Sequence, residues 1–166
     1  MESTVEPHPA RPAEAAAISR LLAACWRHDY AEHLGGQRTE HLIATYCPVS
    51  RITAEISGTG AGDGWLGWLV AEHAGEVVGA AAGGIATVGS GEVYTLCVAV
   101  EHRRRGIGSG LLGALTEQQR ARGAVHQWVS THGGDDPSTP FLARHGFVAD
   151  GEAQPSGTGI RLRRPL

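Results

Sequence analysis

The feature that most restricts the fold of this chain is a glycine-rich turn between a predicted strand and a predicted helix. The turn, 103–108, reads Arg-Arg-Arg-Gly-Ile-Gly and follows the strand-forming stretch 92–100. Beyond it, apolar residues recur at helical spacing as far as Gly123. The first N–H groups of a helix lack internal partners, and the helix dipole adds positive charge at that end. The segment therefore predicts an anion site suited to a pyrophosphate.

Two other phosphate-binding turns are excluded by spacing. A nucleoside-triphosphate loop requires GxxxxGK[ST], and the sequence contains no Gly-Lys pair. A dinucleotide fingerprint requires GxGxxG, whereas Gly106-Ile-Gly108-Ser-Gly110 has the wrong third spacing.

The rest of the pattern predicts one mixed α/β sheet with helices on both faces. Periodicity and turn residues predict helices at 14–33, 39–46, 49–57, 106–122 and 137–145, and strands at 65–72, 76–88, 92–100, 125–130, 147–149 and 160–162. Small residues in 76–88 predict close packing of another element. Residues 1–12 hold three prolines and are expected to form a tail or a short strand near Val5, with a single domain over 13–166.

Composition narrows the class of protein. The chain has 166 residues, 42% of them hydrophobic, and a net charge of -3. We expect no nucleic-acid partner, because a strongly basic face is not indicated. No apolar run approaches the roughly 20 residues that span a bilayer, and we expect neither a membrane association nor a signal peptide. Three widely spaced cysteines without a CxxC predict reduced thiols and a cytoplasmic location.

The turn Arg103-x-x-Gly106-x-Gly108 resembles the [Gln/Arg]-x-x-Gly-x-[Gly/Ala] signature of the GNAT superfamily of acyl-CoA N-acyltransferases. The preceding Leu96-Cys-Val98 and the later segment 141–147, Phe-Leu-Ala-Arg-His-Gly-Phe, are similar to family segments at the same places. The resemblance covers roughly residues 14–150. It implies a central, mostly antiparallel sheet with a splayed parallel strand pair and helices on both faces.

The resemblance also implies acetyl-CoA as co-substrate, seated between strands 92–100 and 125–130. Backbone near Cys97 and Val98 would pair with the pantetheine arm, and the turn would bind the pyrophosphate, with Ser109 at its rim. The implied cofactor-binding residues are Cys97, Val98, Val100, Arg103, Arg104, Arg105, Gly106, Ile107, Gly108 and Ser109.

The implied reaction is direct attack of an amine on the thioester. Glu92, eleven positions before Arg103, matches the family's glutamate base, although a solvated place in the turn before it is an alternative reading. Simple alternation puts Glu92 on the same face as Val98, and a bulge in this strand, which the resemblance makes an alternative, would change that. The N–H of Val98 is the candidate oxyanion donor. Leu142 occupies the slot in which the family often has a tyrosine acid. The thiolate is expected to leave as an anion, with Tyr94 as the alternative acid, and Asp135 fills a slot that is often Asn.

The first two helices offer Trp26, Asp29 and Tyr30, together with Glu32, Glu40 and Tyr46, for a cationic amine, although core packing and solvated faces are the ordinary alternative. Cys97 is expected to be a small core residue and not a nucleophile. The nine histidines show no HExxH or other metal spacing, and we expect no metal. A CoA-binding sensor without transferase activity and a nucleotide-binding regulator are the rival functions. The acceptor's identity and a homodimer remain open.

Overall fold

The structure is a computed structural model that describes residues 5–59, 61–133, 135–153 and 159–166. The helices are α1 (Ala15–Leu34), α2 (Gly36–Tyr46), α3 (Val49–Ser57), α4 (Ile107–Ala121) and α5 (Thr139–Arg144), with 3-10 turns η1 (Pro12–Glu14) and η2 (Val100–His102). The strands are β1 (His8–Pro9), β2 (Trp65–His73), β3 (Glu76–Thr87), β4 (Ser90–Val98), β5 (His126–Thr131), β6 (Val148–Ala153) and β7 (Ile160–Pro165).

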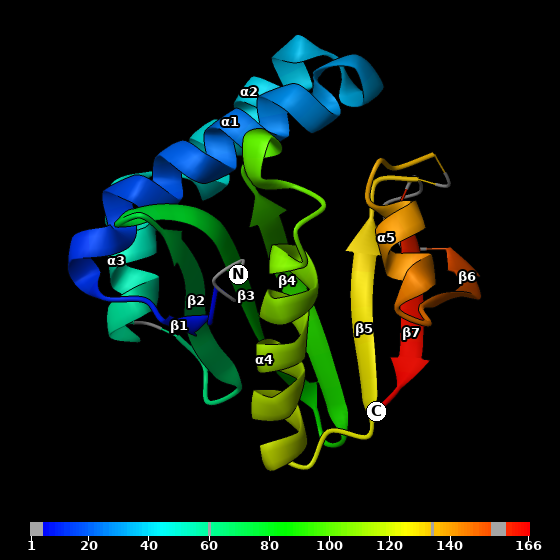
Figure 1. The fold of residues 1–166 in the computed structure, drawn as a ribbon. Coiled ribbons are helices and arrows are strands. Elements are labelled where there is room, and N and C mark those ends of the chain that lie inside the picture. The colour runs from blue at the N-terminus through cyan, green and yellow to red at the C-terminus, as the bar shows by residue number, and fades with distance from the viewer. Residues whose placement is uncertain (1–4, 60, 134, 154–158) are drawn as a thin grey trace.

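These strands form one sheet in the order β1-β2-β3-β4-β5-β7-β6 (Figure 1). Each neighbouring pair is antiparallel except β4 and β5, which run parallel. Helix α1 packs with α2 and α3 on one face, around a core that includes Ile18, Leu22 and Ile52. Helices α4 and α5 cover the other face, around Leu111, Leu115 and Leu142. The predicted fold class is confirmed.

The parallel pair β4–β5 is splayed. Only four positions are paired, from Ser90↔His126 to Val93↔Val129, although β4 continues to Val98 and β5 to Thr131. The carboxyl halves of the two strands therefore diverge. Beyond Val93 the edge of β4 that faces β5 makes no ladder.

Strand β3 lets α4 approach the sheet closely because it lacks side chains at the contact. A Cβ atom on Gly79 would lie 2.8 Å from Leu111, and one on Gly83 would lie 2.8 Å from Leu115. This confirms the close packing that the small residues predicted. Those glycines thereby set the depth at which α4, and the turn that starts it, sits on the sheet.

A buried polar network holds the closed end of the splay. Gln119 of α4 donates to the carbonyl oxygens of Gly84 and Glu92, at 3.2 and 3.0 Å. Gln127 of β5 donates to the side chain of Gln119 at 2.8 Å and accepts from Arg164 of β7. Both glutamines are fully buried. The network joins α4 to β3, β4, β5 and β7, so the strands part only at their other end.

Several boundaries differ from prediction. The short first strand lies at His8–Pro9 and not near Val5. Strand β4 ends at Val98, because residues 100–102 turn into a 3-10 helix. Helix α5 begins at Thr139, two residues after Pro137, because Asp136 accepts hydrogen bonds from the backbone and hydroxyl of Ser138 and holds the chain in a turn. Within the described residues no helix is both long and apolar enough to cross a membrane.

Candidate functional site

A cavity of about 1190 Å³ occupies the splay between β4 and β5 and continues beneath α1, α2 and α3. At one end lies the glycine-rich turn with α5, and at the other lie aromatic side chains from the first helices and from β2 and β4. Thus one continuous space runs from the predicted anion site, past the open edge of β4, to the predicted acceptor side chains.

The turn exposes a row of backbone donors. Arg104 and Gly106 adopt left-handed backbone, with φ of 62° and 81°. The first helical bond runs from Gly110 N–H to the carbonyl of Gly106 at 2.9 Å. Among the described residues, no protein acceptor takes the N–H groups of residues 104–109. These groups are the unpaired donors of a helix start, and they meet the requirement for an anion site.

Arg103 was expected to add positive charge beside the turn, but its guanidinium is bound by other parts of the protein. Its Nε donates to the carbonyl of Val98 at 2.9 Å, and its two terminal nitrogens bind Asp29 of α1 at 2.8 and 2.9 Å. Burial raises the pKa of Asp29, but hydrogen bonds from Arg103 and His28 outweigh it and lower the pKa overall. The guanidinium of Arg103 is a brace between the turn, the strand and the helix. Of the three arginines in the turn, Arg104 lines the cavity without a described ion pair.

The backbone of β4 presents alternate residues to the cavity. Ala99 donates to the carbonyl of Val78 at 2.8 Å, so in an antiparallel ladder the polar groups of Val98 and Leu96 point away from β3. The carbonyl of Val98 already accepts from Arg103 and from the Cys25 thiol. The N–H of Val98 therefore faces the open edge, as its candidate role requires.

Cys97 lines the cavity, but its backbone is oriented differently from that of Leu96 and Val98. By the same alternation its backbone groups point to β3, where it pairs with Ala80, and not to the cavity. Its side chain is buried among α1 residues, and a hydrogen bond with Cys25, together with burial, raises the pKa of the thiol well above its ordinary value. Backbone pairing with a ligand therefore falls to Leu96 and Val98, and the thiol is a core group.

Two of the predicted cofactor residues do not line the cavity. Val100 lies in η2 and is 40% exposed, and the side chain of Arg105 is likewise outside the cavity wall. Gly106, Ile107, Gly108 and Ser109 all line it. Ser109 lies 3.0 Å from the ring of His145, which closes the rim of the turn.

Glu92 has a partner that the sequence did not indicate. Its two carboxylate oxygens are bound by Arg161 of β7, at 3.0 and 2.9 Å, and only 7% of the residue is exposed. Residues 93–98 line the cavity, but Glu92 does not. Accepting a proton would weaken this two-point ion pair with Arg161, because it removes the charge of the carboxylate.

Glu92 lies outside the cavity because β4 has a bulge at Tyr94. Ala82 pairs with Thr95 and Gly83 with Val93, which leaves Tyr94 as the extra residue of β4. Simple alternation would place Glu92 and Val98 on one face, and the extra residue changes that. Tyr94 is stacked on Trp65, with ring centroids 6.0 Å apart, and burial followed by the charge of Glu92 raises its pKa.

A second cluster lies where β5 ends. The Tyr30 hydroxyl donates to Asp136 at 3.3 Å, and the His132 ring packs edge-on against Tyr30 at 5.0 Å. Tyr30 and His132 line the cavity. Burial, and then the charge of Asp136, raises the pKa of Tyr30 strongly, whereas burial lowers the pKa of His132 despite that charge. Asp136, and not the exposed Asp135, is the buried acid of this loop.

Helix α5 forms the opposite wall. Leu142 is buried and lines the cavity, in the slot where the family often has a tyrosine. Phe141 lies beside Gly108, where an added Cβ would be 3.4 Å from the ring. The side chain of Leu142 cannot donate a proton to the leaving group.

The acceptor end is more aromatic than the sequence indicated. Trp26, Asp29 and Tyr30 all line the cavity, and Trp65 and Trp68 join them from β2. Trp68 is 5% exposed, and its Nε1 has no hydrogen-bond partner among the described residues. Of the predicted acidic groups, Asp29 is bound by Arg103 and Glu40 by Arg27. The two β2 tryptophans escaped prediction because their alternating strand pattern also fits an ordinary core.

Comparison with known proteins settles the family. The chain matches the Acetyltransferase (GNAT) family over residues 16–147. The chain belongs to this family. The predictions of the GNAT superfamily and of an acyltransferase enzyme are confirmed by this match.

Solved GNAT structures share the fold over nearly the whole chain. The PaiA N-acetyltransferase of Thermoplasma acidophilum, solved with coenzyme A, superposes with a TM-score of 0.87 at 16% identity, covering 99% of this chain and 100% of that one. A GCN5-related N-acetyltransferase from Rhodopseudomonas palustris gives 0.80 at 23% identity, with 100% and 98% coverage. N-acetylglutamate synthase from Neisseria gonorrhoeae, complexed with coenzyme A and N-acetyl-glutamate, gives 0.68 at 18%, with 100% of this chain on 36% of that one. A search of the curated proteins finds no match.

Proposed function

We propose that this GNAT enzyme transfers the acetyl group of acetyl-CoA directly to a primary amine of a small molecule or peptide. The observation that carries the proposal is the continuity of one cavity from the free N–H groups of residues 104–109 to the open edge of β4. A diphosphate at the turn and an extended arm along the edge use donors that the fold leaves without partners.

Acetyl-CoA is held mainly by backbone groups of the protein. The pyrophosphate takes N–H groups between Arg104 and Ser109, with Arg104 adding charge from its side chain. The pantetheine amides pair with Leu96 along the open edge of β4, as an added strand would. The thioester then lies beside Val98, whose N–H stabilises the developing oxyanion.

The attacking amine must lose a proton before or during attack. A lysine-like ammonium, with a pKa near 10.4, costs roughly 4–5 kcal/mol to deprotonate at pH 7. We propose His132 as the base, because it lines the cavity and burial lowers its pKa, which keeps the imidazole neutral at pH 7. Glu92, the base implied by the resemblance, is the alternative and would act through water after releasing Arg161.

The leaving thiolate departs as an anion. Tyr30 and Tyr94 have a raised pKa and hold their protons at neutral pH, which makes them weak acids toward a thiolate with a pKa near ~8.5. Tyr30 gives up its hydrogen bond to Asp136 and donates to the sulfur, in place of the missing tyrosine of α5. Tyr94, stacked on Trp65, belongs to the acceptor end.

The acceptor is an amine on an aromatic or apolar body. Trp26, Trp65 and Tyr94 offer ring faces to a cation, and the nearest carboxylates are already bound by arginines. A polyamine with several separated charges lacks matching acids along this wall. We further propose a cytoplasmic location, which rests on the three widely spaced cysteines of the sequence.

The test is release of free CoA thiol from acetyl-CoA with a panel of arylalkylamines, polyamines and peptides, followed by mass spectrometry of the products. We expect an acetylated amine, with arylalkylamines favoured. The rival function is a CoA-binding sensor, which Leu142 and the Arg161-bound Glu92 favour. Tight binding of acetyl-CoA without any acetylated product over the whole panel would establish the sensor, and absence of acetyl-CoA binding would refute both.

A further inference from the structure

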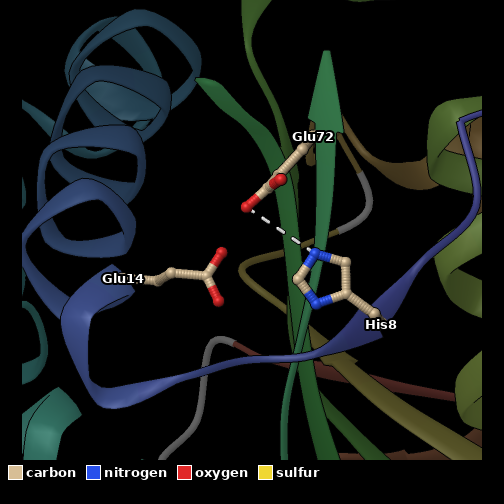
Figure 2. A group of neighbouring side chains, drawn as sticks. All are labelled: His8, Glu14 and Glu72. Carbon is tan, nitrogen blue, oxygen red and sulfur yellow. Dashed lines mark ion pairs between the residues drawn. The ribbon is translucent and has the colours of Figure 1, made fainter. Parts of the chain in front are cut away.

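Three side chains meet at the edge of the sheet where β1 pairs with β2. His8 comes from β1, Glu14 from η1 directly before α1, and Glu72 from β2, and one donor atom from each lies within 4.8 Å of the others. Figure 2 shows the imidazole and both carboxylates directed toward one point between the N-terminal segment and β2. None of the three lines the acetyl-transfer cavity.

The imidazole is oriented as a ligand. Nδ1 of His8 lies 2.9 Å from the carbonyl oxygen of Pro9, and a carbonyl can only accept, so Nδ1 carries the proton. In neutral imidazole the lone pair then sits on Nε2, the atom that faces Glu72. A backbone carbonyl that fixes the tautomer in this way is the usual outer partner of a metal-binding histidine.

Glu14 contributes a buried oxygen that the protein leaves without a partner. The residue is 8% exposed. Its Oε1 accepts from the backbone and side chain of Arg11, at 2.8 and 3.1 Å, whereas Oε2 is buried and has no hydrogen-bond partner among the described residues. A buried carboxylate oxygen without a donor is costly, and a cation removes the cost.

The spacing and charge of the group also fit an ion. Nε2 of His8 is 3.7 Å from Oε1 of Glu72, which is too long for a hydrogen bond. Zinc bonds to nitrogen and oxygen are about 2.0–2.2 Å, so two ligands of one ion lie about 3.5 Å apart. Arg11 forms ion pairs with both carboxylates but carries a single positive charge. One of the two negative charges therefore remains unbalanced by Arg11.

We propose that His8, Glu14 and Glu72 bind one divalent transition-metal ion, of which Zn²⁺ is the best match. One imidazole and two carboxylates suit zinc and its neighbours better than Mg²⁺, which prefers oxygen alone. Three protein ligands leave a position for water. Histidine spacing in the sequence gave no sign of such a site, because its ligands are brought together only by the fold.

The ion would fasten the N-terminal segment to the sheet. β1 pairs with β2 over only two residues, His8↔Val70 and Pro9↔Leu69. Nearby, Pro7 lies against α4, 3.9 Å from where a Cβ of Gly110 would stand. A metal between β1, β2 and the start of α1 would stabilise this short pairing without entering the catalytic cavity.

The test is calorimetric titration of the full chain with ZnCl2, together with thermal unfolding. We expect one Zn²⁺ per chain, and a melting temperature raised by about 5 °C or more when zinc is at 100 times its dissociation constant. His8→Gln and Glu72→Gln should each weaken binding at least tenfold, which at the same zinc concentration reduces the thermal shift by about half or more. His41→Gln, which removes an exposed histidine on α2, is the matched control and should bind as the parent does.

Comparison of the unfolding temperatures without metal shows that each variant is folded. Glu14→Gln is not used, because it also removes the ion pair with Arg11. The proposal is overturned if the parent binds no Zn²⁺, if His8→Gln and Glu72→Gln bind it as tightly as the parent, or if Arg11→Gln binds it more weakly. The last result would mean that the cluster is a salt-bridge network organised by Arg11.

Discussion

Replacement of Gly106 by valine separates the conformational role of this residue from its role in phosphate binding. Gly106 has a φ of 81°, and a Cβ built on it meets no protein atom within 4 Å. The substitution therefore costs backbone strain without a clash, about 1–2 kcal/mol. For a chain of this size, each kcal/mol lowers the melting temperature by about 2–4 °C, so we expect a fall of about 2–8 °C.

The added side chain projects into the cavity beside the free N–H groups. Loss of one or two hydrogen bonds to a charged phosphate, each worth about 1.5–3 kcal/mol, weakens binding by roughly tenfold or more. Isothermal titration with acetyl-CoA measures this loss. S-acetylpantetheine, which lacks the pyrophosphate, should bind the variant and the parent equally.

Gly123 supplies the matched control at the other end of the same helix. It has a φ of 85°, and a Cβ there also meets nothing within 4 Å. Gly123→Val should lose as much stability as Gly106→Val while keeping its affinity for acetyl-CoA. The reasoning is refuted if Gly106→Val binds acetyl-CoA as tightly as the parent, or if both variants lose affinity equally, because the loss would then come from the fold.

Three further predictions concern the reaction and the brace behind the turn. His132→Gln should lower kcat/KM by about 10²–10⁴-fold. It should also remove the acidic limb of the pH–rate profile, which in the parent falls below pH 6.5 because the base must be unprotonated. A loss of that size in Glu92→Gln, with His132→Gln near the parent, would make Glu92 the base. Tyr30→Phe should lower kcat by about tenfold, the value of one hydrogen bond, and Tyr94→Phe should keep most activity; a hundredfold loss in Tyr94→Phe with acetyl-CoA binding intact would make Tyr94 the acid. The pKa of Asp29 is lowered in the folded protein, so its ion pair with Arg103 stabilises the fold above the unfolded-state pKa of about 3.9. This stabilisation is lost as the pH falls through the folded-state pKa. Urea unfolding should therefore show a smaller loss of stability on acidification in Asp29→Asn than in the parent, and an identical pH profile would contradict this.

The sequence by itself determined the parts that depend on local pattern. Helical periodicity placed the helices 49–57 and 107–121 within a residue or two, and glycine spacing identified the phosphate turn, because a tight turn and an open helix start are properties of a few consecutive residues. The register between strands is not local. One extra residue at Tyr94 changed which face Glu92 occupies, and no alternation count could detect it.

Only the tertiary structure decided which side chains are free to react. Arg103 and Glu92 were both predicted to face ligands, and each is instead bound by a residue from a distant element, Asp29 in one case and Arg161 in the other. His132 and the trio of His8, Glu14 and Glu72 gained their interest the same way, through neighbours contributed by other strands and helices. A charged group's availability depends on the partners within about 4 Å of it, and those are set by how sheet and helices pack and not by sequence separation.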